Sequence, residues 1–449
     1  MKYSSNKLQY ESQARILLSV LAFSSMLGIF PFFIFSFVQH YRFKLYGQVV
    51  LLWIIGIIGW AVFILRLFEN RKNVFHQNFT RVCSPPFWLS LMLLWSVLST
   101  IFSTDTFTSV FGTIYRFDGL YSYLAYAGIF ILALQVHSRK SIKTILNIFV
   151  ATASSIAFFG LLNIHAINRY LILRPQYGTF ENQNHYGYYL AMALPCALWL
   201  YATDDAEGRK QKVGIRILRV FEITFLCNGM IQAVSMGPLI AVLSSMVVLS
   251  IVVFVRFRRE FKRLIGMELY MLVVMGISAV GTWNLVGDTG NMIKDFGVLF
   301  RHMSGTADMK DEDALNSIGS SRGVLWRYAI QFMKERPLFG YGLDNLGGRY
   351  AAVGCTNDRA HNEFLQYGAS LGIPALIFYI AGLWSLFWKG VKNFKKLDLW
   401  TVCSCVVVIS YLVNSLFGNT MYYTVPFYWM LLGICYNQVT RCTEETKEI

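Results

Sequence analysis

Residues 48–65 read QVVLLWIIGIIGWAVFIL, eighteen consecutive residues without a charged side chain. A stretch of this length and composition is typical of a helix that crosses a membrane, which needs about twenty apolar residues. Further apolar runs, bounded by charged or turn residues, recur along the 449-residue chain. Together they predict membrane-spanning helices near residues 16–38, 48–65, 87–103, 119–136, 142–164, 186–202, 217–233, 237–255, 264–286, 366–388, 399–418 and 421–437. The two spans between residues 217 and 255 are so close that Ser235 and Gly237 are expected to form the turn between them.

The composition of the whole chain points the same way. Hydrophobic residues make up 55% of the sequence and charged residues only 14%, and a soluble protein this apolar could not cover its surface. The first fifteen residues are polar and no early apolar block precedes a small-residue cleavage site, so we expect no removable signal peptide. The expected fold class is all-α, a polytopic membrane helix bundle of about twelve transmembrane helices with one large extracytoplasmic loop.

The net charge of +15 would indicate a nucleic-acid partner in a soluble protein. Here the basic residues form short clusters between apolar blocks, which is typical of topology anchors, so we expect membrane lipids and no nucleic acid as surroundings. With the N-terminus inside, the predicted inner segments carry 26 of the 40 lysine and arginine residues. Nine of the other 14 lie in one long outer loop, where the positive-inside rule hardly applies. The pattern predicts that both termini are cytoplasmic.

This reading divides the chain into three parts. Residues 1–286 hold membrane helices 1 to 9, residues 287–365 form the large extracytoplasmic loop, and residues 366–449 hold helices 10 to 12 and a cytoplasmic tail. Within the loop, residues 322–335 have the pattern of an amphipathic helix, with Ser320 or Ser321 as its cap and Pro337 just past its end. The side chains expected on its apolar face are Val324, Leu325, Tyr328 and Phe332. The glycines of the following PLFGYGLDNLGG predict close backbone approach.

Several chemistries are absent from the sequence. The eight cysteines show no paired metal-binding spacing and are interpreted as small apolar residues. The chain has no GxxxxGK[ST] phosphate loop, no HExxH zinc motif and no GxSxG nucleophile motif. Charges within the predicted spans are few, which weighs against a proton- or ion-coupled transporter.

Three polar clusters lie on the predicted outer face. The first runs from Arg174 to Pro195 and places Arg174, Asn182, Asn184 and His185 directly before a span, where side chains can meet a ligand at the membrane surface. A plainer interpretation is that an asparagine caps the helix while His185 extends towards the interface.

The second cluster, SSRGVLWRYA at residues 320–329, contains Arg322 and Arg327. An arginine near a helix start offers a permanent, forked set of donors that suits phosphate oxygens, whereas a solvated surface arginine is the plainer interpretation. A smaller pair, Arg116 and Asp118, could supply a further phosphate or sugar contact or simply form a local ion pair.

The third cluster, at residues 358–376, places His361, Asn362, Glu363 and Gln366 at the entry to the tenth span. A histidine at a membrane mouth can accept a proton from a hydroxyl near neutral pH, as a general base must. A neighbouring asparagine or glutamate could fix its tautomer. The plainer interpretation is an interfacial histidine with a capping role.

In this order and spacing, the clusters resemble the O-antigen ligase and O-antigen polymerase superfamily of bacterial envelope proteins. The matching stretches are GTFENQNHYGYYLAMALP (178–195), SRGVLWRYAIQFMKERPLFGYGLDN (321–345) and RAHNEFLQYGASLGIPALI (359–377), with FGTIYRFDGLYSYLAY (111–126) as a supporting match. The resemblance covers roughly residues 110–440.

The resemblance implies a metal-independent, GT-C-like glycosyltransferase of the inner membrane, without a cofactor, in cell-surface polysaccharide biosynthesis. Its donor would be a glycan on a polyprenyl diphosphate such as undecaprenyl diphosphate, and its acceptor a hydroxyl of a glycan, lipid or protein at the outer face. By the same analogy His361 is the catalytic base and Arg174 and Arg322 hold the diphosphate. The residues expected around the pocket are Asn182, Asn184, His185, Asn362, Glu363 and Arg116.

Two positions depart from the family pattern. Ser235, Met236 and Gly237 stand where many members have Ser-Arg-Gly, so an arginine common at that outer helix end is missing, and Ser370 stands where a glutamate is common. These departures leave open which acceptor is used. The alternative function is a multi-span transporter or flippase for an envelope glycan, which would place polar groups along a path through the membrane centre.

Overall fold

The computed structural model describes residues 2–28, 40–68, 79, 81–82, 84–113, 116–161, 178–180, 182–204, 209–286 and 322–444, and the regular elements among them are all helices. The first group comprises α1 (Lys2–Phe23), the 3-10 helix η1 (Ser24–Gly28), α3 (His40–Leu67), α5 (Pro85–Ile101), α6 (Thr106–Phe111), α7 (Leu120–Ala133), α8 (Arg139–Leu161) and α10 (Gln183–Thr203). The second group comprises α11 (Arg209–Gln232), α12 (Met236–Arg256), α13 (Arg258–Val286), α16 (Arg322–Glu335), α17 (Leu346–Ala352), α18 (Glu363–Leu371), α19 (Ile373–Lys392), the 3-10 helix η2 (Phe394–Lys396), α20 (Leu399–Ser415) and α21 (Val425–Glu444). The expected all-α class is confirmed for these residues.

Within the described residues, five helices are long and apolar enough to cross a membrane. They are Gln48–Leu67, Arg139–Leu161, Met236–Arg256, Arg258–Gly281 and Ile373–Lys392. Three shorter helices, α5, α7 and α20, are also apolar. The chain is therefore a helical membrane protein, while twelve crossings, the outer position of the long loop and the cytoplasmic position of the termini stay predictions.

The predicted span near residues 366–388 is wrong at its start. Helix α18 ends at Leu371, and α19 begins at Ile373 after a break at Gly372. Gly372 has a φ of +91°, and a Cβ there would lie 2.0 Å from the Leu338 carbonyl oxygen. The apolar run continues through the break in the sequence, so hydropathy alone did not reveal the turn.

The turn between α11 and α12 also differs in detail from the expected one. Residues 233–235 form it, with Val234 in the left-handed region at a φ of +43° and Ser235 in the cap position of α12. Gly237, expected in the turn, lies instead in the first turn of α12. A Cβ on Gly237 would come within 3.0 Å of Asn414 and Phe417, so the glycine lets α12 approach α20 closely.

Helix α10 is the most enclosed element of the bundle. It packs against α8, α11, α12 and α20, and nearly every residue from His185 to Leu200 is buried. Because a helix that is apolar all round must be covered on every side, its polar first turn is the part of α10 available to a ligand.

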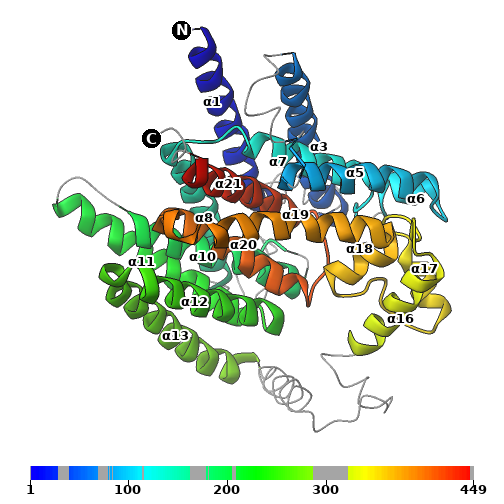
Figure 1. Cartoon of the computed structure of the whole chain (residues 1–449). Coiled ribbons are helices and arrows are strands. Elements are labelled where there is room, and N and C mark those ends of the chain that lie inside the picture. The colour runs from blue at the N-terminus through cyan, green and yellow to red at the C-terminus, as the bar shows by residue number, and fades with distance from the viewer. Residues whose placement is uncertain are drawn as a thin grey trace.

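Helices α16, α17 and α18 lie together at one end of the bundle (Figure 1). Helix α16 has the predicted bounds, Arg322–Glu335. Of its predicted apolar face, Leu325 and Phe332 are buried in a small cluster and Tyr328 is partly buried, and the Tyr350 hydroxyl donates to the Leu325 carbonyl at 3.1 Å. Its expected caps, Ser320 and Ser321, lie outside the described residues. These contacts fix the position of the α16 N-terminus.

The glycine-rich turn after α16 joins this end to the rest of the molecule. A Cβ on Gly340 would lie 2.4 Å from the Ser370 carbonyl oxygen, and one on Gly342 would lie 2.2 Å from the Ser109 hydroxyl oxygen. The Ser99 hydroxyl donates to the carbonyls of Phe339 at 2.6 Å and Ser370 at 3.1 Å. The expected close backbone approach is confirmed, and it holds α18 against the end of α5.

Candidate functional site

A polar pocket gathers most of the predicted site residues that the structure describes. It contains about 580 Å³ of empty space, part of it open to solvent. Its lining residues are Arg116, Asn182, Asn184, His185, Tyr188, Ser235, Pro238, Asn357, His361, Asn414, Phe417, Gly418 and Asn419. Five of the nine residues predicted for the site are on this wall, and they come from three separate parts of the chain.

The first turn of α10 forms one side of the pocket. The Asn182 side chain accepts a hydrogen bond from the Asn184 backbone N–H at 2.7 Å, so Asn182 is the helix cap that the plainer interpretation expected. The Asn184 side-chain oxygen accepts from the Ser235 hydroxyl at 2.7 Å. The next residue of the helix, His185, is buried. Asn182 therefore caps the helix, as the plainer interpretation expected, whereas His185 is buried and does not extend towards the interface.

His361 also lines the pocket and has a strained backbone conformation. Its φ is +51°, a region that non-glycine residues rarely adopt. Asn419, in the connection between α20 and α21, accepts the His361 backbone N–H at 3.0 Å. The Asn419 amide nitrogen lies 3.3 Å from Nδ1 and 3.5 Å from Nε2 of the imidazole. The amide that positions the ring is thus Asn419, rather than the neighbouring Asn362 or Glu363.

The imidazole of His361 is neutral at physiological pH. Burial lowers its pKa to about 4, and the positive charges of Arg322 and Arg116 act in the same direction. Asp358 opposes them. A neutral imidazole can accept a proton, and an anion bound near the two arginines would raise its pKa and make it a stronger base.

Arg116 is in the pocket wall, but its charge is already paired. Its Nε and Nη2 atoms donate to the two carboxylate oxygens of Asp358, each at 2.9 Å. Burial opposes ionisation of Asp358, yet Arg116 and Arg359 together lower its pKa. The local Arg116–Asp118 pair considered from the sequence does not form, because each residue has a partner across the fold.

The partner of Asp118 is Arg359. Arg359 is fully buried and contacts three loops. It donates to Asp118 at 2.8 Å and to the Thr420 carbonyl at 2.9 Å, and it also pairs with Asp344. The Thr420 hydroxyl donates to Asp118 at 2.6 Å. Burial raises the pKa of Asp118 despite this contact with Arg359. The network fixes the segment that carries His361 relative to the starts of α7 and α21.

Asn362 and Glu363, expected around the pocket, are not among its lining residues. Asn362 caps α18 by accepting the Leu365 N–H at 3.1 Å. Glu363 is fully buried, and its carboxylate accepts from the hydroxyls of Tyr367 and Tyr411, each at 2.8 Å. These hydrogen bonds fix the start of α18, which directly follows His361 in the chain. Their proximity in sequence to His361 led to their inclusion among the pocket residues.

The two arginines expected at the diphosphate cannot both be placed. Arg322 is the first residue of α16 and is partly buried. It does not line the pocket, but its charge lowers the pKa of His361, so it acts on the same site. Arg174 lies outside the described residues.

Sequence reasoning missed several lining residues. Asn357 precedes the third cluster, Asn414 is an asparagine within an apolar run, and Asn419 lies in a short connection predicted on the same face as His361. An isolated amide inside a predicted span was the available signal for Asn414. Nothing local distinguished Asn357 and Asn419 from ordinary loop residues.

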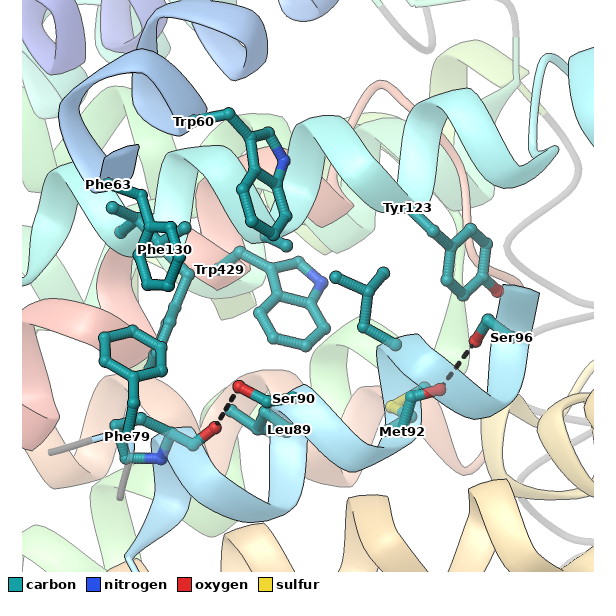
Figure 2. Close-up of a pocket in the computed structure, with 14 residues that line it drawn as sticks. Trp60, Phe63, Phe79, Leu89, Ser90, Met92, Ser96, Tyr123, Phe130 and Trp429 are labelled. Carbon is teal, nitrogen blue, oxygen red and sulfur yellow. Dashed lines mark hydrogen bonds between the residues drawn. The ribbon is translucent and has the colours of Figure 1, made fainter. Parts of the chain in front are cut away.

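A second cavity, with about 550 Å³ of empty space that is partly open to solvent, lies among α3, α5, α7 and α21. Figure 2 shows that aromatic and aliphatic side chains, including Trp60 and Trp429, surround it. The hydroxyls of Ser90 and Ser96 donate to carbonyls of their own helix, at 2.7 and 2.9 Å. This cavity has no carboxylate, histidine, lysine or arginine among its described lining residues, so the polar pocket is the candidate site.

Comparison with known proteins finds a match to one family model. Residues 224–380 match the family model described as "O-Antigen ligase", which confirms the resemblance seen in the sequence. The matched segment contains Arg322 and His361. A Haemophilus influenzae (strain Rd) protein, described as "Uncharacterized protein", is 24% identical over 137 residues. This match covers 28% of the chain and 34% of that protein, so the chain spans about a third of this relative's length.

Proposed function

We propose that the chain is a lipid-linked glycan transferase, because residues 224–380 match the O-antigen ligase family model and the chain is a helical membrane protein. It moves a glycan from a polyprenyl diphosphate carrier to an acceptor hydroxyl at the outer face of the cytoplasmic membrane. The observation that carries this proposal is the position of His361 in the wall of a polar pocket, where Asn419 contacts both its backbone N–H and its imidazole.

The proposed reaction is a single displacement. His361 takes the proton from the acceptor hydroxyl, and the hydroxyl oxygen forms a new bond to the anomeric carbon of the donor glycan. The bond between that carbon and the diphosphate oxygen breaks. Its electron pair leaves with the polyprenyl diphosphate, and the proton remains on His361 until it passes to solvent or to the leaving group.

Arg322 is the described residue best suited to hold the departing diphosphate. It stands at the N-terminus of the 14-residue helix α16, where the helix dipole also favours negative charge. Its forked guanidinium can bind two phosphate oxygens at once. Arg174 is proposed as the second arginine by analogy with the family. The bound diphosphate would also raise the pKa of His361 and improve it as a base.

Asn419 supports the assignment of the base. Its contacts with both the backbone and the ring of His361 hold an otherwise strained residue in one orientation. Strain of this kind persists only where surrounding contacts enforce it and is concentrated at functional sites. No metal or cofactor has a role in the proposed step.

Deletion of the gene in the host bacterium tests the proposal. We expect surface glycan to be lost and lipid-linked glycan to accumulate on the outer face of the membrane. Full-length polymer on the carrier would identify a ligase, and single repeat units would identify a polymerase. Accumulation on the cytoplasmic face would instead identify a flippase and contradict the proposal.

A further inference from the structure

We infer that the apolar cavity among α3, α5, α7 and α21 binds one acyl chain of a membrane glycerolipid, and that the Trp429 indole N–H donates to the ester carbonyl of this chain. The site is separate from the polar pocket, and its ligand is a lipid of the surrounding bilayer rather than the polyprenyl donor. The inference is carried by the lining and length of the cavity and by a buried N–H that has no partner.

The lining of this cavity is almost entirely apolar. On α5 it runs from residue 86 to residue 96, and on α7 from residue 123 to residue 131. At 1.5 Å of rise per residue the cavity is therefore about 12–15 Å long, roughly half the thickness of the hydrocarbon core of a bilayer. Ser90 and Ser96 donate their hydroxyls to carbonyls of their own helix, so neither offers a donor to a ligand. A single hydrocarbon chain matches this length and lining.

The cavity opens on an apolar surface of the molecule. Ile64 follows the lining residue Phe63 on α3, and Leu94 follows the lining residue Leu93 on α5. Ile64 is 51% exposed and Leu94 is 58% exposed. In a membrane protein, exposed apolar side chains of this kind face lipid chains rather than water. A chain from the bilayer therefore reaches the cavity without passing polar groups.

Close contacts between α3 and α7 fix one wall of the cavity. A Cβ on Gly59 would lie 2.1 Å from the Gly128 carbonyl oxygen, so the two backbones touch at these glycines. The next residue, Trp60, donates from Nε1 to the Leu124 carbonyl at 2.8 Å and lines the cavity with its ring. Since α3 is fixed against α7 in this way, the space beside them is already formed, and a ligand enters it without moving either helix.

Trp429 places an unpaired hydrogen-bond donor in the opposite wall. The residue is 6% exposed, and its Nε1 atom is buried without a hydrogen-bond partner. Its ring packs edge to face against Phe130, with the centroids 5.9 Å apart, and Figure 2 shows the indole among the other lining side chains. Buried N–H groups are nearly always paired, because an unmade hydrogen bond is costly. This group therefore indicates a ligand that brings an acceptor into an otherwise apolar space.

An ester carbonyl is the acceptor that a glycerolipid offers at the depth of Trp429. Helix α21 begins at Val425, so Trp429 lies about 6 Å along the helix from that end. Asn419, in the polar pocket, directly precedes this end of α21. Trp429 is therefore close to the end of the bundle that holds the polar pocket, where ester groups join the headgroups of a leaflet to their chains. The chain then extends along α5 towards Pro86. A polyprenyl chain is a pure hydrocarbon and would leave the Trp429 N–H unpaired.

Buried tyrosines separate this cavity from the polar pocket. Tyr123, in the cavity wall, packs edge to face against Tyr367, with the centroids 6.2 Å apart. The hydroxyls of Tyr367 and Tyr411 both donate to the buried Glu363 carboxylate, each at 2.8 Å. Tyr411 in turn packs against Tyr188 in the wall of the polar pocket, at 5.3 Å between centroids. The two cavities share no described lining residue. A donor bound at the polar pocket would have to pass around this cluster to place its chain here, whereas a bilayer lipid enters directly.

Competition binding to the purified full-length protein, followed by native mass spectrometry, tests this inference. The probes are a diacyl phosphatidylethanolamine, its dialkyl ether analogue, which lacks the ester carbonyls, and undecaprenyl phosphate. We expect the wild-type protein to bind the diacyl lipid roughly 2- to 10-fold more tightly than the ether lipid, which is the effect of one hydrogen bond. Undecaprenyl phosphate should not displace the diacyl lipid, because the two have separate sites.

Three variants locate the binding in this cavity. Trp429→Phe keeps an aromatic ring and removes the donor, so it should bind the diacyl and ether lipids equally. Ala127→Phe fills part of the cavity and should weaken the binding of both lipids. Trp384→Phe changes an exposed tryptophan of α19 outside the lining and should keep the wild-type preference. Because each protein is compared with itself on two lipids, a general loss of stability does not imitate the loss of this preference.

Four results would overturn the inference. They are equal binding of the two lipids by the wild-type protein, a preference that survives in Trp429→Phe, undiminished binding by Ala127→Phe, and displacement of the diacyl lipid by undecaprenyl phosphate. The last result would assign the cavity to the polyprenyl chain of the donor.

Discussion

The side chain of Asn419 contacts His361 twice: its oxygen accepts the backbone N–H at 3.0 Å, and its amide nitrogen lies 3.3 Å from Nδ1 of the ring. Asn419 and His361 are 58 residues apart. The contact ties the connection after α20 to the segment before α18, and it stabilises a φ of +51° at His361. It also offers a way to change the electrostatics of the proposed base without removing it.

Replacement of Asn419 by aspartate uses this contact. An aspartate keeps an oxygen that accepts the His361 N–H and adds a negative charge beside the imidazole. An opposite charge at this distance favours the imidazolium, so the acid limb of kcat/KM should move up by about 1–3 pH units. Asn419→Ala, which removes both contacts, should lower the rate without this upward move. An unchanged limb in Asn419→Asp would show that His361 does not control the profile.

The wild-type pH profile follows from the pKa of His361. Its folded-state pKa of about 4 lies below the ordinary value, and the neutral form is the one that accepts a proton. Activity measured as kcat/KM should therefore stay level from neutral pH down to about pH 5 and fall as the pH passes through 4. The limb in kcat should lie at a higher pH, because bound diphosphate raises the pKa. A kcat limb below the kcat/KM limb would contradict this electrostatic coupling.

Arg322→Lys tests the forked diphosphate contact. Lysine keeps the charge but loses the planar pair of donors, and a lost charged hydrogen bond costs about 1.5–3 kcal/mol. We expect transfer efficiency to fall by roughly 10- to 100-fold. Arg327→Lys on the exposed side of the same helix is the matched control and should transfer normally. Equal rates in the two variants would remove Arg322 from the site.

Arg359→Ala tests the buried network that positions the His361 segment. Arg359 is 1% exposed, and its loss would leave Asp118 and Asp344 buried without their cation. Breaking a buried pair in this way costs about 3–5 kcal/mol. The apparent melting temperature of the purified protein should therefore drop clearly. Arg139→Ala, which removes an exposed pair with Asp398, should have little effect, and a similar drop in both would argue against a special role for the buried network.

The helices could be predicted from the sequence because their signal is local. A membrane span needs about twenty apolar residues in a row, and described helices overlap all the predicted spans. The helix Arg322–Glu335 was equally clear from its periodicity and from Pro337. The break at Gly372 was missed because the residues on both sides of it are apolar, and only the backbone contact with Leu338 requires the glycine there.

The candidate site was predictable only in part, because its wall is assembled by long-range packing. His361 and the first turn of α10 were found as polar groups at helix entries. A local pair between Arg116 and Asp118 was one of two interpretations of the sequence, yet the partner of Arg116 is Asp358, which lies 242 residues away. Such pairings depend on how α7 meets the loop before α18, and no local pattern encodes that meeting. The contact of Asn419 with His361 also joins residues far apart in the sequence, so no local pattern predicted it.

Transfer by purified His361→Ala protein in proteoliposomes is the most direct test of the proposed chemistry. The assay follows a labelled glycan from a polyprenyl diphosphate donor to the acceptor, with wild-type protein beside it and donor binding measured on both. Loss of the general base should slow transfer by about 10²- to 10⁴-fold while donor binding persists. Transfer at the wild-type rate would contradict the assignment of His361 as the group that deprotonates the acceptor.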